Sequence, residues 1–293
     1  MARLLRQHNL ININININTS IIYGLMNIKY FDVTLRDGLQ SISNCYSFEE
    51  KKSLLNTIVS KANPDSIEIG SIVSPKILPQ MSDSLKLYKY AIEKYNCPKF
   101  YMLIPNENAM KIADTHKINN ISLVTSISDA FQKKNVNKSL VESKEEIKKI
   151  LTMYDLNNVK LYISCINRCP ITGIQDTSKI IEELMYYVNF NKITEFCISD
   201  TCGDLDYNTF YYLINIIKKI IDVDKISLHL HVSKSNVENT KKIIKYALSL
   251  KIIKYDVSYV KNIGGCSVTM NDIINPNLTY EILNDCINDG INI

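Results

Sequence analysis

The segment YFDVTLRDGLQS, residues 30–41, places an arginine and an aspartate side by side where an apolar, β-prone run ends. Arg36 cannot lose its proton in a protein, and its planar guanidinium makes paired contacts with oxyanions. Asp37 can offer a hard oxygen ligand to a divalent cation, and Gly38 gives the backbone freedom to turn beneath both. The alternative is an ordinary charged surface turn, so the chemistry depends on what lies near this segment.

A second candidate is the tripeptide HLH in SLHLHVS, which holds two of the four histidines of the chain. Successive strand residues point to opposite faces, so His229 and His231 face the same way. A single histidine on a strand is usually a hydrogen-bonded core residue, whereas two on one face suit a divalent metal. Asp37 and an asparagine after the next strand could complete the site, and mixed nitrogen and oxygen ligands favour Mg²⁺ or Mn²⁺ over a thiolate zinc site.

Three further polar residues follow β-prone runs and are candidates for catalysis. Glu68 and Asp200 could handle protons or hold the site together, and the alternative for each is an ion pair with Arg36. Cys266 follows two glycines, which could let a loop close over a substrate. A thiol on such a loop could carry a proton, and the alternative is a small residue in a turn.

These residues need a scaffold that gathers the ends of many strands. The sequence alternates short β-prone runs with stretches of helical spacing, a pattern that predicts parallel β–α–β units. The expected strands are residues 28–34, 66–69, 99–104, 121–125, 159–164, 194–199, 226–231 and 254–258. The expected helices are residues 47–61, 83–95, 107–116, 140–154, 177–189, 207–221, 235–250 and 279–288.

Eight strand–helix units in roughly 265 residues favour an α/β fold of the (β/α)8 TIM-barrel type, whose usual size is about 250 residues. The alternative is a doubly wound open sheet, but the chain lacks a Gly-rich phosphate loop after its first expected strand. Active sites of TIM barrels lie at the carboxyl ends of the strands. The candidate residues follow the expected strands, so the barrel would bring them together on one rim.

Composition argues against several other classes of function. The chain is 46% hydrophobic, and its 34 basic and 30 acidic residues are too balanced to indicate a nucleic-acid-binding surface. No apolar run approaches the ~18 residues that a membrane-spanning helix needs. Eight cysteines without a secretory signal are typical of reduced thiols. We therefore expect a cytoplasmic protein that binds neither nucleic acid nor a membrane.

The first 26 residues differ from the rest, because residues 10–18 alternate Ile and Asn after a leading Leu. We expect residues 1–26 to be a low-complexity, poorly ordered extension and residues 27–293 to form the barrel domain. The first 31 residues contain no acid and carry Arg3, Arg6 and Lys29. This composition weakly resembles a mitochondrial transit peptide, so the mitochondrial matrix is the alternative location.

Several motifs follow one another in an order that indicates a family. They are TLRDGLQ, IEIGSIVSPKILPQM, IPNENAMKIA, SDAFQKKNVNKSLVES, YISCINRCPITG, ISDTCGD, LHLH and GGC. Together they resemble the 3-hydroxy-3-methylglutaryl-CoA lyase family of the DRE-type TIM-barrel metallolyase superfamily. The RDG element is shared with isopropylmalate and homocitrate synthases, whereas VSPK-x3-PQM, F-x-KKN-x-N-x-S and GGC are specific to the lyases.

The resemblance implies a retro-Claisen cleavage of hydroxymethylglutaryl-CoA to acetyl-CoA and acetoacetate with Mg²⁺ or Mn²⁺. It implies that Asp37, His229 and His231 bind the metal together with one asparagine. Asn275 keeps the family's distance from the cysteine, whereas Asn277 keeps the leucine that follows the ligand, so both stay candidates.

The resemblance also assigns roles in catalysis. Arg36 would stabilise the enolate of acetyl-CoA. Cys266 or His229 would help to protonate the enolate carbon. Glu68 and Asp200 would orient this network of side chains.

The resemblance further implies an acyl-CoA substrate and is compatible with a homodimer. The residues expected to contact the substrate are Arg36, Ser71, Lys160 and Thr201. Lys160 stands where the family has an arginine, and a lysine cannot make the paired hydrogen bonds with which an arginine binds a carboxylate or phosphate.

Other departures from the family pattern keep the function open. Ser41, Ile42 and Ser43 replace the family's Asn-Glu-Lys, Val232 replaces the acid after the second histidine, and CSVTMNDIINPNL lacks the usual glycines. Three hypotheses fit. The first is that the protein is a working lyase. The second is that it is a related metal-dependent aldolase, lyase or synthase-like enzyme that acts on another acyl-CoA or 2-oxo acid. The third hypothesis is a catalytically degenerate barrel that acts as a binding protein.

Overall fold

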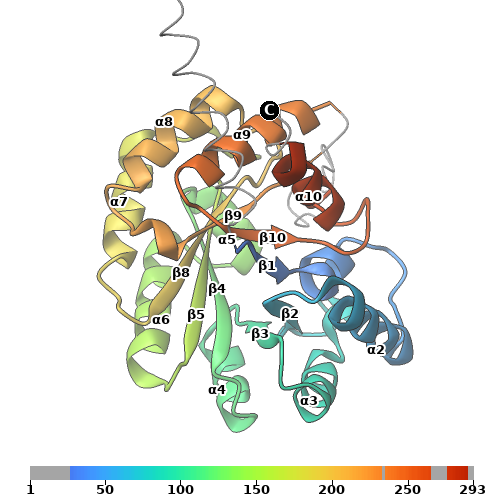
Figure 1. Ribbon diagram of the computed structural model, residues 1–293. Helices are drawn as coiled ribbons and strands as arrows, with labels where there is room; N and C mark the ends of the chain where they lie inside the picture. The colour runs from blue at the N-terminus through green and yellow to red at the C-terminus, as the bar shows by residue number, and fades with distance from the viewer. Residues whose placement is uncertain (1–26, 233–234, 265–275, 290–293) are drawn as a thin grey trace, which may run out of the picture.

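The computed structural model describes residues 27–232, 235–264 and 276–289 (Figure 1). Eight parallel strands close into a barrel in the order β1-β10-β9-β8-β5-β4-β3-β2, which confirms the predicted (β/α)8 barrel. The barrel strands are β1 (Lys29–Asp32), β2 (Ser66–Ser71), β3 (Lys99–Leu103), β4 (Asn120–Ser126), β5 (Asn158–Ser164), β8 (Ile193–Ser199), β9 (Ile226–His229) and β10 (Lys254–Val257). The predicted extension over residues 1–26 lies outside the described residues.

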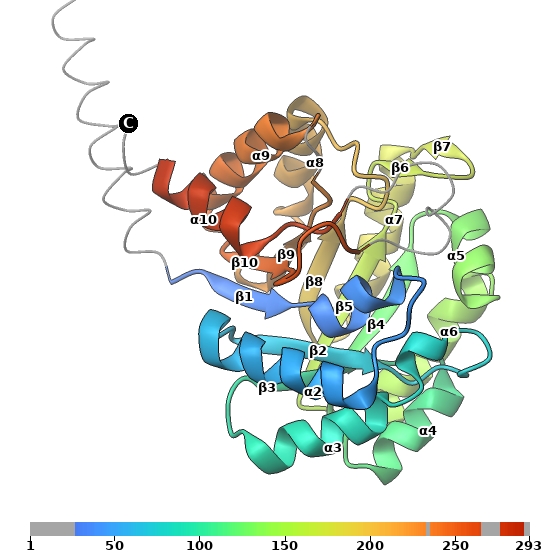
Figure 2. The ribbon, with the colours of Figure 1, turned by 90° about the vertical axis from the view of Figure 1, so that its right-hand side faces the viewer.

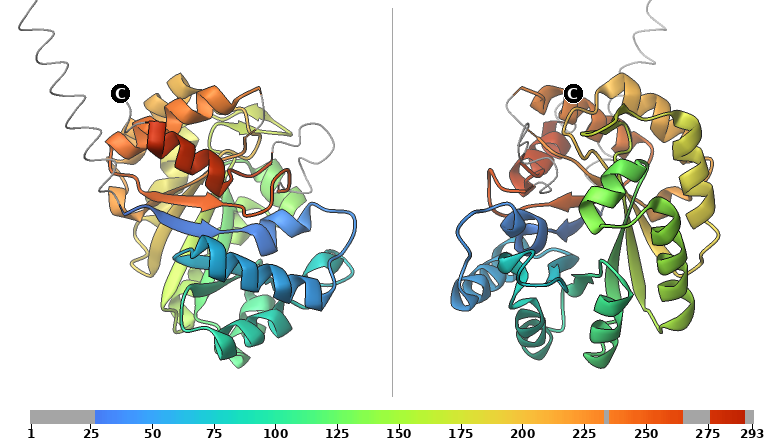
Figure 3. Two further views of the ribbon diagram at one scale, coloured as in Figure 1. Left: turned by 45° about the vertical axis from the view of Figure 1, so that its right-hand side comes forward. Right: turned by 180° about the vertical axis from the view of Figure 1, so that it is seen from behind.

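Helices surround the barrel on its outside, as the two views of Figure 3 show. They are α2 (Phe48–Thr57), α3 (Ser84–Lys94), α4 (Glu107–Thr115), α5 (Asp129–Val136), α6 (Leu140–Met153), α7 (Thr177–Tyr187), α8 (Tyr207–Ile217), α9 (Val237–Ser249) and α10 (Tyr280–Asp289). Short helical turns are η1 (Thr34–Gly38), η2 (Ile58–Ala62), η3 (Pro79–Met81) and η4 (Val223–Lys225). In the part of the chain that the structure describes, no helix combines the length and apolar character needed to cross a membrane.

Closure of the barrel places its first strand, β1, beside its last strand, β10. β1 pairs in parallel with β10 on one side and with β2 on the other (Figure 2). Tyr30 lies opposite Tyr255, and Phe31 lies opposite Ser66. The residues that follow β1 therefore lie beside those that follow β9 and β10, although about 200 positions separate them in the sequence.

The alternation of side chains along each strand separates an apolar layer from a polar interior. On β5, Leu161 and Ile163 are fully buried in the main apolar cluster. Lys160 and Tyr162 face the opposite way and contact residues of other barrel strands across the interior. The apolar layer stabilises the barrel through burial, and the polar interior supplies groups for chemistry at the rim.

The structure adds elements that the sequence pattern did not predict. After β4 the chain forms two helices, α5 and α6, where one was expected. A two-stranded hairpin, β6 (Arg168–Cys169) with β7 (Gly173–Ile174), lies between β5 and α7. The first strand is shorter than the predicted 28–34, because the chain turns into η1 at Thr34. These elements are short, so periodicity gives little signal for them.

One buried carboxyl makes the stability of this fold depend on pH. Asp32 is fully buried, accepts hydrogen bonds from the Thr34 N–H and the Tyr280 hydroxyl at 2.9 Å each, and burial raises its pKa to about 6. Its usual pKa is about 3.9. Folding therefore favours the protonated form of Asp32. Its contribution to the free energy of unfolding is complete below about pH 4 and is lost as the pH rises through 6.

We expect Asp32→Asn to stabilise the protein at high pH, because the amide carries no charge. Its oxygen can accept from the Thr34 N–H, and its nitrogen can donate to the Tyr280 hydroxyl. The free energy of unfolding should exceed that of the wild type by about 3 kcal/mol at pH 8 and approach it near pH 4. Urea denaturation of both proteins at the two pH values measures this difference. An unchanged difference across the pH range would contradict the burial argument.

Candidate active site

The arginine and aspartate that open the sequence argument lie in a helical turn rather than a surface loop. Residues Thr34–Gly38 form a π-helical turn in which all five residues are buried, and such turns are frequent at functional sites. Gly38 is not needed for backbone freedom, contrary to our interpretation. A Cβ at Gly38 would lie 2.7 Å from Ile263 Cδ1, so glycine is needed there for space.

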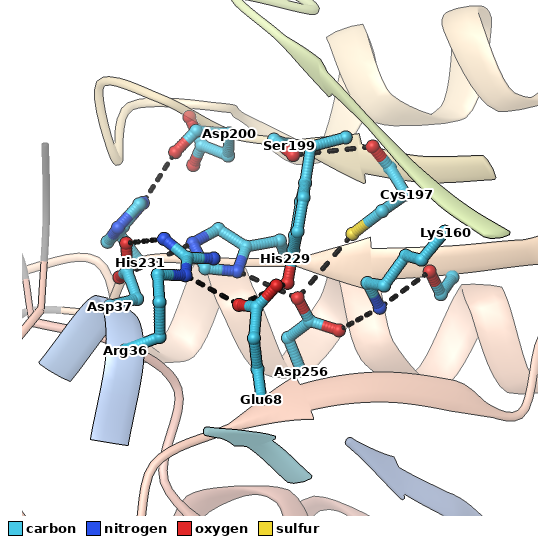
Figure 4. Close-up of polar contacts among 12 residues, drawn as sticks. Arg36, Asp37, Glu68, Lys160, Cys197, Ser199, Asp200, His229, His231 and Asp256 are labelled. Atoms are coloured by element: carbon cyan, nitrogen blue, oxygen red, sulfur yellow. Dashed lines mark hydrogen bonds and ion pairs between the residues drawn. The ribbon is translucent and has the colours of Figure 1, made fainter. Parts of the chain in front are cut away.

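Arg36 is held by two carboxylates inside the barrel mouth (Figure 4). Its Nε donates to Glu68 Oε2 at 2.5 Å and its Nη1 donates to Asp37 Oδ1 at 2.6 Å. The Tyr162 hydroxyl donates to the same Glu68 oxygen at 3.1 Å, and the guanidinium carbon lies 5.1 Å from the centre of the Tyr162 ring. Arg36 is thus fixed by residues from β2, β5 and its own turn.

Asp37 stays ionised although it is buried. Burial favours the neutral acid, but the charge of Arg36 and the neighbouring histidines hold the pKa of Asp37 well below its usual range. Gln40 Nε2 also donates to Asp37 Oδ1 at 2.6 Å. One oxygen of Asp37 is therefore occupied by Arg36 and Gln40, and Oδ2 faces the histidines.

Asp37, His229 and His231 form the cluster that the sequence predicted. One ligand atom from each lies within 4.8 Å of the others, and all three residues are buried. His231 Nδ1 donates to the Asp200 carbonyl at 2.7 Å, and its Nε2 is buried without a hydrogen-bond partner. Burial lowers the pKa of His231 to about 4, so its ring is neutral at pH 7 and has a lone pair to offer.

The structure describes one of the two candidate asparagines. Asn277 is 2% exposed, its backbone pairs with that of His231, and its side-chain amide interacts with Asp37. A Cβ on Gly264 would lie 2.3 Å from Asn277 Cγ, at a φ of +118°, so this glycine makes room for the amide. Asn275 and Cys266 lie outside the described residues.

The donor set fits a hard divalent cation. Two imidazoles, one carboxylate and one amide are ligand types found around Mn²⁺ and Mg²⁺. The buried Nε2 of His231, which has no hydrogen-bond partner, costs free energy unless something satisfies it. In addition, the four carboxylates of Asp37, Glu68, Glu195 and Asp256 face three cationic side chains, those of Arg36, Lys160 and Lys254, which leaves an excess of negative charge.

Lys160 does not line the cavity, contrary to the substrate-binding role predicted for it. Its side chain is 1% exposed, and its Nζ contacts Asp256 Oδ1 and Glu195 Oε1 at 2.5 Å each. Lys160 lies near the start of β5, below Tyr162 on the same face of the strand. It is therefore too deep in the barrel to meet a ligand at the rim.

Glu68 and Asp200, the two other predicted acids, lie in different environments. Glu68 makes the ion pair with Arg36 that we considered as its alternative role. Asp200 makes no ion pair among the described residues. Its carboxylate accepts the N–H groups of Asp204 and Leu205 at 3.3 Å, and burial raises its pKa to about 7. These contacts favour a role in shaping the loop after β8 over proton transfer.

A cavity of about 220 Å³ opens above the cluster. Arg36, Asp37, His229 and His231 form its polar end, and the predicted substrate contacts Ser71 and Thr201 also line it. The remaining wall is largely apolar and is formed by Val73, Ile77, Leu78, Leu103, Pro105, Val124, Phe131 and Val136. Such a cavity suits a small acyl group with one charged end.

Sequence reasoning missed four residues that support the site. Gln40 and Tyr162 hold Asp37 and Glu68, and Asp256 accepts from His229 Nδ1 at 3.0 Å. Cys197 Sγ donates to the same Asp256 oxygen at 3.6 Å. Strand alternation carried a signal for two of them, because Tyr162 lies two residues after Lys160 and Asp256 two residues after Lys254.

The fold and the site together define a class of protein. A closed parallel barrel with an Arg–Asp pair after its first strand and two histidines at the end of its seventh is the arrangement of the DRE-type TIM-barrel lyases. A sequence model of the HMGL-like family matches residues 27–236. The chain belongs to the HMGL-like family, and it is an enzyme of the hydroxymethylglutaryl-CoA lyase type.

Individual relatives agree with this assignment. The chain is 28% identical over 272 residues to the mitochondrial hydroxymethylglutaryl-CoA lyase of Macaca fascicularis, covering 91% of this chain and 81% of that protein. The solved hydroxymethylglutaryl-CoA lyase of Pseudomonas aeruginosa is similar with a TM-score of 0.78 and 25% identity, over 91% of this chain and 86% of that one. An Acinetobacter baumannii lyase solved with coenzyme A and 3-methylmalate has the same fold, with a TM-score of 0.78 and 21% identity over 90% and 84% of the two chains.

We expect Gly264→Ala to weaken binding of Mn²⁺, because the new methyl group would displace the Asn277 amide. The dissociation constant should rise about 10-fold or more, as is typical when a ligand's support is disturbed. Gly173→Ala is the matched control, since Gly173 also has a positive φ, of +80°, but has no atom within 4 Å of a Cβ. Calorimetric titration with Mn²⁺ measures both variants, and an equal effect of the two would contradict the role of Asn277.

Proposed function

We propose that the protein cleaves 3-hydroxy-3-methylglutaryl-CoA to acetyl-CoA and acetoacetate with the help of a divalent cation. The observation that carries this proposal is the convergence of Asp37, His229 and His231 with the guanidinium of Arg36 at one end of a single cavity. A retro-Claisen cleavage needs both features, because one oxyanion must form for the bond to break and a second forms when it breaks.

Asp37, His229, His231 and Asn277 would hold the cation. Bound there, a Mg²⁺ or Mn²⁺ ion would polarise the tertiary hydroxyl and the free carboxylate of the substrate and acidify the hydroxyl. His231 offers Nε2 for this role, since its Nδ1 is engaged by the Asp200 carbonyl, and Asp37 offers a carboxylate oxygen within the same cluster. Asn275 stays the alternative amide ligand.

Arg36 would stabilise the enolate that forms on the thioester fragment. Nε and Nη1 are engaged by Glu68 and Asp37, which leaves Nη2 to donate to the thioester oxygen. Glu68 and Tyr162 fix the guanidinium before the reaction, so no reorganisation is needed as charge develops. This assigns Glu68 a positioning role rather than direct proton transfer.

The proton balance needs one base and one acid. A base removes the proton of the tertiary hydroxyl, the bond between the second and third carbons breaks, and its electron pair passes to the thioester enolate. The enolate carbon then takes a proton from Cys266 or through His229. Of these two groups, His229 lines the cavity, and Cys266 is assigned its role from the family motif alone.

The apolar wall of the cavity supports an acyl-CoA substrate. Phe131 and Val136 of the short helix α5 line the cavity together with Val73, which follows β2, and Leu103, the last residue of β3. An apolar channel of this kind can bury the thioester chain while Arg36 and the metal cluster hold its polar end. The homodimer and the cytoplasmic or mitochondrial location stay predictions.

We expect Mn²⁺-dependent release of acetoacetate from hydroxymethylglutaryl-CoA by the wild type, with loss of activity when a chelator removes the metal. His229→Ala should abolish turnover, because it removes a ligand. Arg36→Gln should lower kcat by about 100- to 1,000-fold, the usual cost of losing an oxyanion donor. Arg168→Gln is the matched control, since Arg168 is a half-exposed arginine of the same rim that pairs with Asp204 outside the cavity.

Other outcomes separate the remaining hypotheses. No turnover by a folded protein that binds Mn²⁺ would overturn the substrate assignment and favour another acyl-CoA or 2-oxo acid. No turnover and no metal binding would favour the degenerate barrel. Equal activity of the Arg36→Gln and Arg168→Gln variants would contradict the role of Arg36.

A further inference from the structure

A buried chain of contacts runs beneath the rim, from Lys160 through Asp256 to His229 (Figure 4). Lys160 Nζ lies 2.5 Å from Asp256 Oδ1, and Asp256 Oδ2 lies 3.0 Å from His229 Nδ1. Lys160 is 1%, Asp256 2% and His229 6% exposed. The three residues come from β5, β10 and β9, so the chain of contacts joins three strands in the barrel interior.

Asp256 in this chain acts as a hydrogen-bond acceptor on both oxygens. The Lys160 ammonium donates to Oδ1 at 2.5 Å, and the Cys197 thiol donates to Oδ2 at 3.6 Å, so the carboxylate is surrounded by donors and is held in its ionised form by the Lys160 charge. An ionised carboxylate has no proton to give. The hydrogen bond between Asp256 and His229 therefore requires the proton to lie on His229 Nδ1.

This requirement determines which nitrogen of His229 carries a lone pair. A neutral imidazole has one N–H and one lone pair, so a proton on Nδ1 leaves Nε2 as the free acceptor. His229 Nε2 lies 3.9 Å from Asp37 Oδ2, a distance too long for a hydrogen bond. Both residues belong to the cluster that could hold a metal ion. His231 is held the same way by a different acceptor, the backbone carbonyl of Asp200.

We propose that Asp256 and Lys160 are positioning residues that fix His229 in the tautomer whose Nε2 can bind the cation. Asp256 imposes the tautomer, and Lys160 holds the carboxylate in place. The purpose of this arrangement rests on the proposed function, since it matters only if the cluster binds a metal. The competing explanation is that Lys160 only neutralises the buried acids of the barrel.

The wild-type protein alone tests the first step. The chain has four histidines, so ¹⁵N-histidine labelling and long-range ¹H–¹⁵N correlation at pH 8 can resolve each ring, with His229 and His231 assigned by single substitution to Gln. We expect both to carry the proton on Nδ1 in the metal-free protein. A proton on Nε2 of His229 would overturn the proposal, and this result does not depend on whether any variant at Asp256 folds.

Variants test the second step. Asp256→Asn presents an amide that can donate to Nδ1, so we expect His229 to shift to the Nε2–H tautomer while His231 keeps its own. The Mn²⁺ dissociation constant should rise by about 10- to 100-fold, as for other groups that orient metal-bound histidines. Lys160→Met should also weaken Mn²⁺ binding, and Lys160→Arg should restore it, because an arginine can still donate to Asp256.

Glu195→Gln is the matched control. Glu195 contacts Lys160 at 2.5 Å as Asp256 does, but the described residues include no contact between it and His229. If Lys160 and its acids serve only charge balance, Glu195→Gln should change the Mn²⁺ affinity as much as Asp256→Asn, and the proposal is then wrong. An unchanged His229 tautomer in Asp256→Asn would also overturn it. Neither readout uses a substrate, so failure to cleave hydroxymethylglutaryl-CoA would count against the proposed function alone.

Discussion

The burial of Arg36 is the constraint on which the rest of the site depends. Its guanidinium cannot be neutralised, and a buried charge without partners costs several kcal/mol. Glu68 and Asp37 satisfy it at 2.5 and 2.6 Å, and Tyr162 holds Glu68 in turn. The same contacts that make the burial tolerable also aim the guanidinium at the cavity. Stability and chemistry therefore require the same geometry at this position.

A second buried cation, Lys160, is paired with carboxylates in a deeper layer of the barrel interior. Below the Arg36 group, Lys160 is enclosed by Asp256, Glu195 and the ring of Phe31, whose centre lies 3.9 Å from Nζ. Asp256 connects the two layers, since one of its oxygens contacts Lys160 and the other contacts His229. Carboxylates outnumber cationic groups in these layers, so a bound cation at the rim would balance the charge of the whole interior.

The sequence predicted the architecture because the barrel repeats one simple pattern. Apolar, β-branched strands and amphipathic helices alternate eight times, and the site residues follow the strands, so both the fold and the rim could be expected. The predictions for Asp37, His229 and His231 needed only strand alternation and chain order. The structure brings these three together as expected.

What the sequence could not predict depends on contacts across the barrel. The role of Lys160 depends on how far from the rim it lies along its strand. Tyr162, two residues later on β5, lines the cavity, whereas Lys160 does not. Likewise, the space taken by Ile263 explains Gly38 better than backbone freedom does. The position of Asn277 follows from pairing with the His231 backbone, which spacing from the cysteine does not reveal.

The measurement that tests the central claim most directly is anomalous diffraction from crystals of the protein grown with Mn²⁺. The account predicts one strong anomalous peak within bonding distance of Asp37, His229 and His231, with the Asn277 amide as the fourth protein ligand. A peak bound elsewhere, or an ordered cluster that takes up no Mn²⁺, would contradict the claim that this rim is a metal centre.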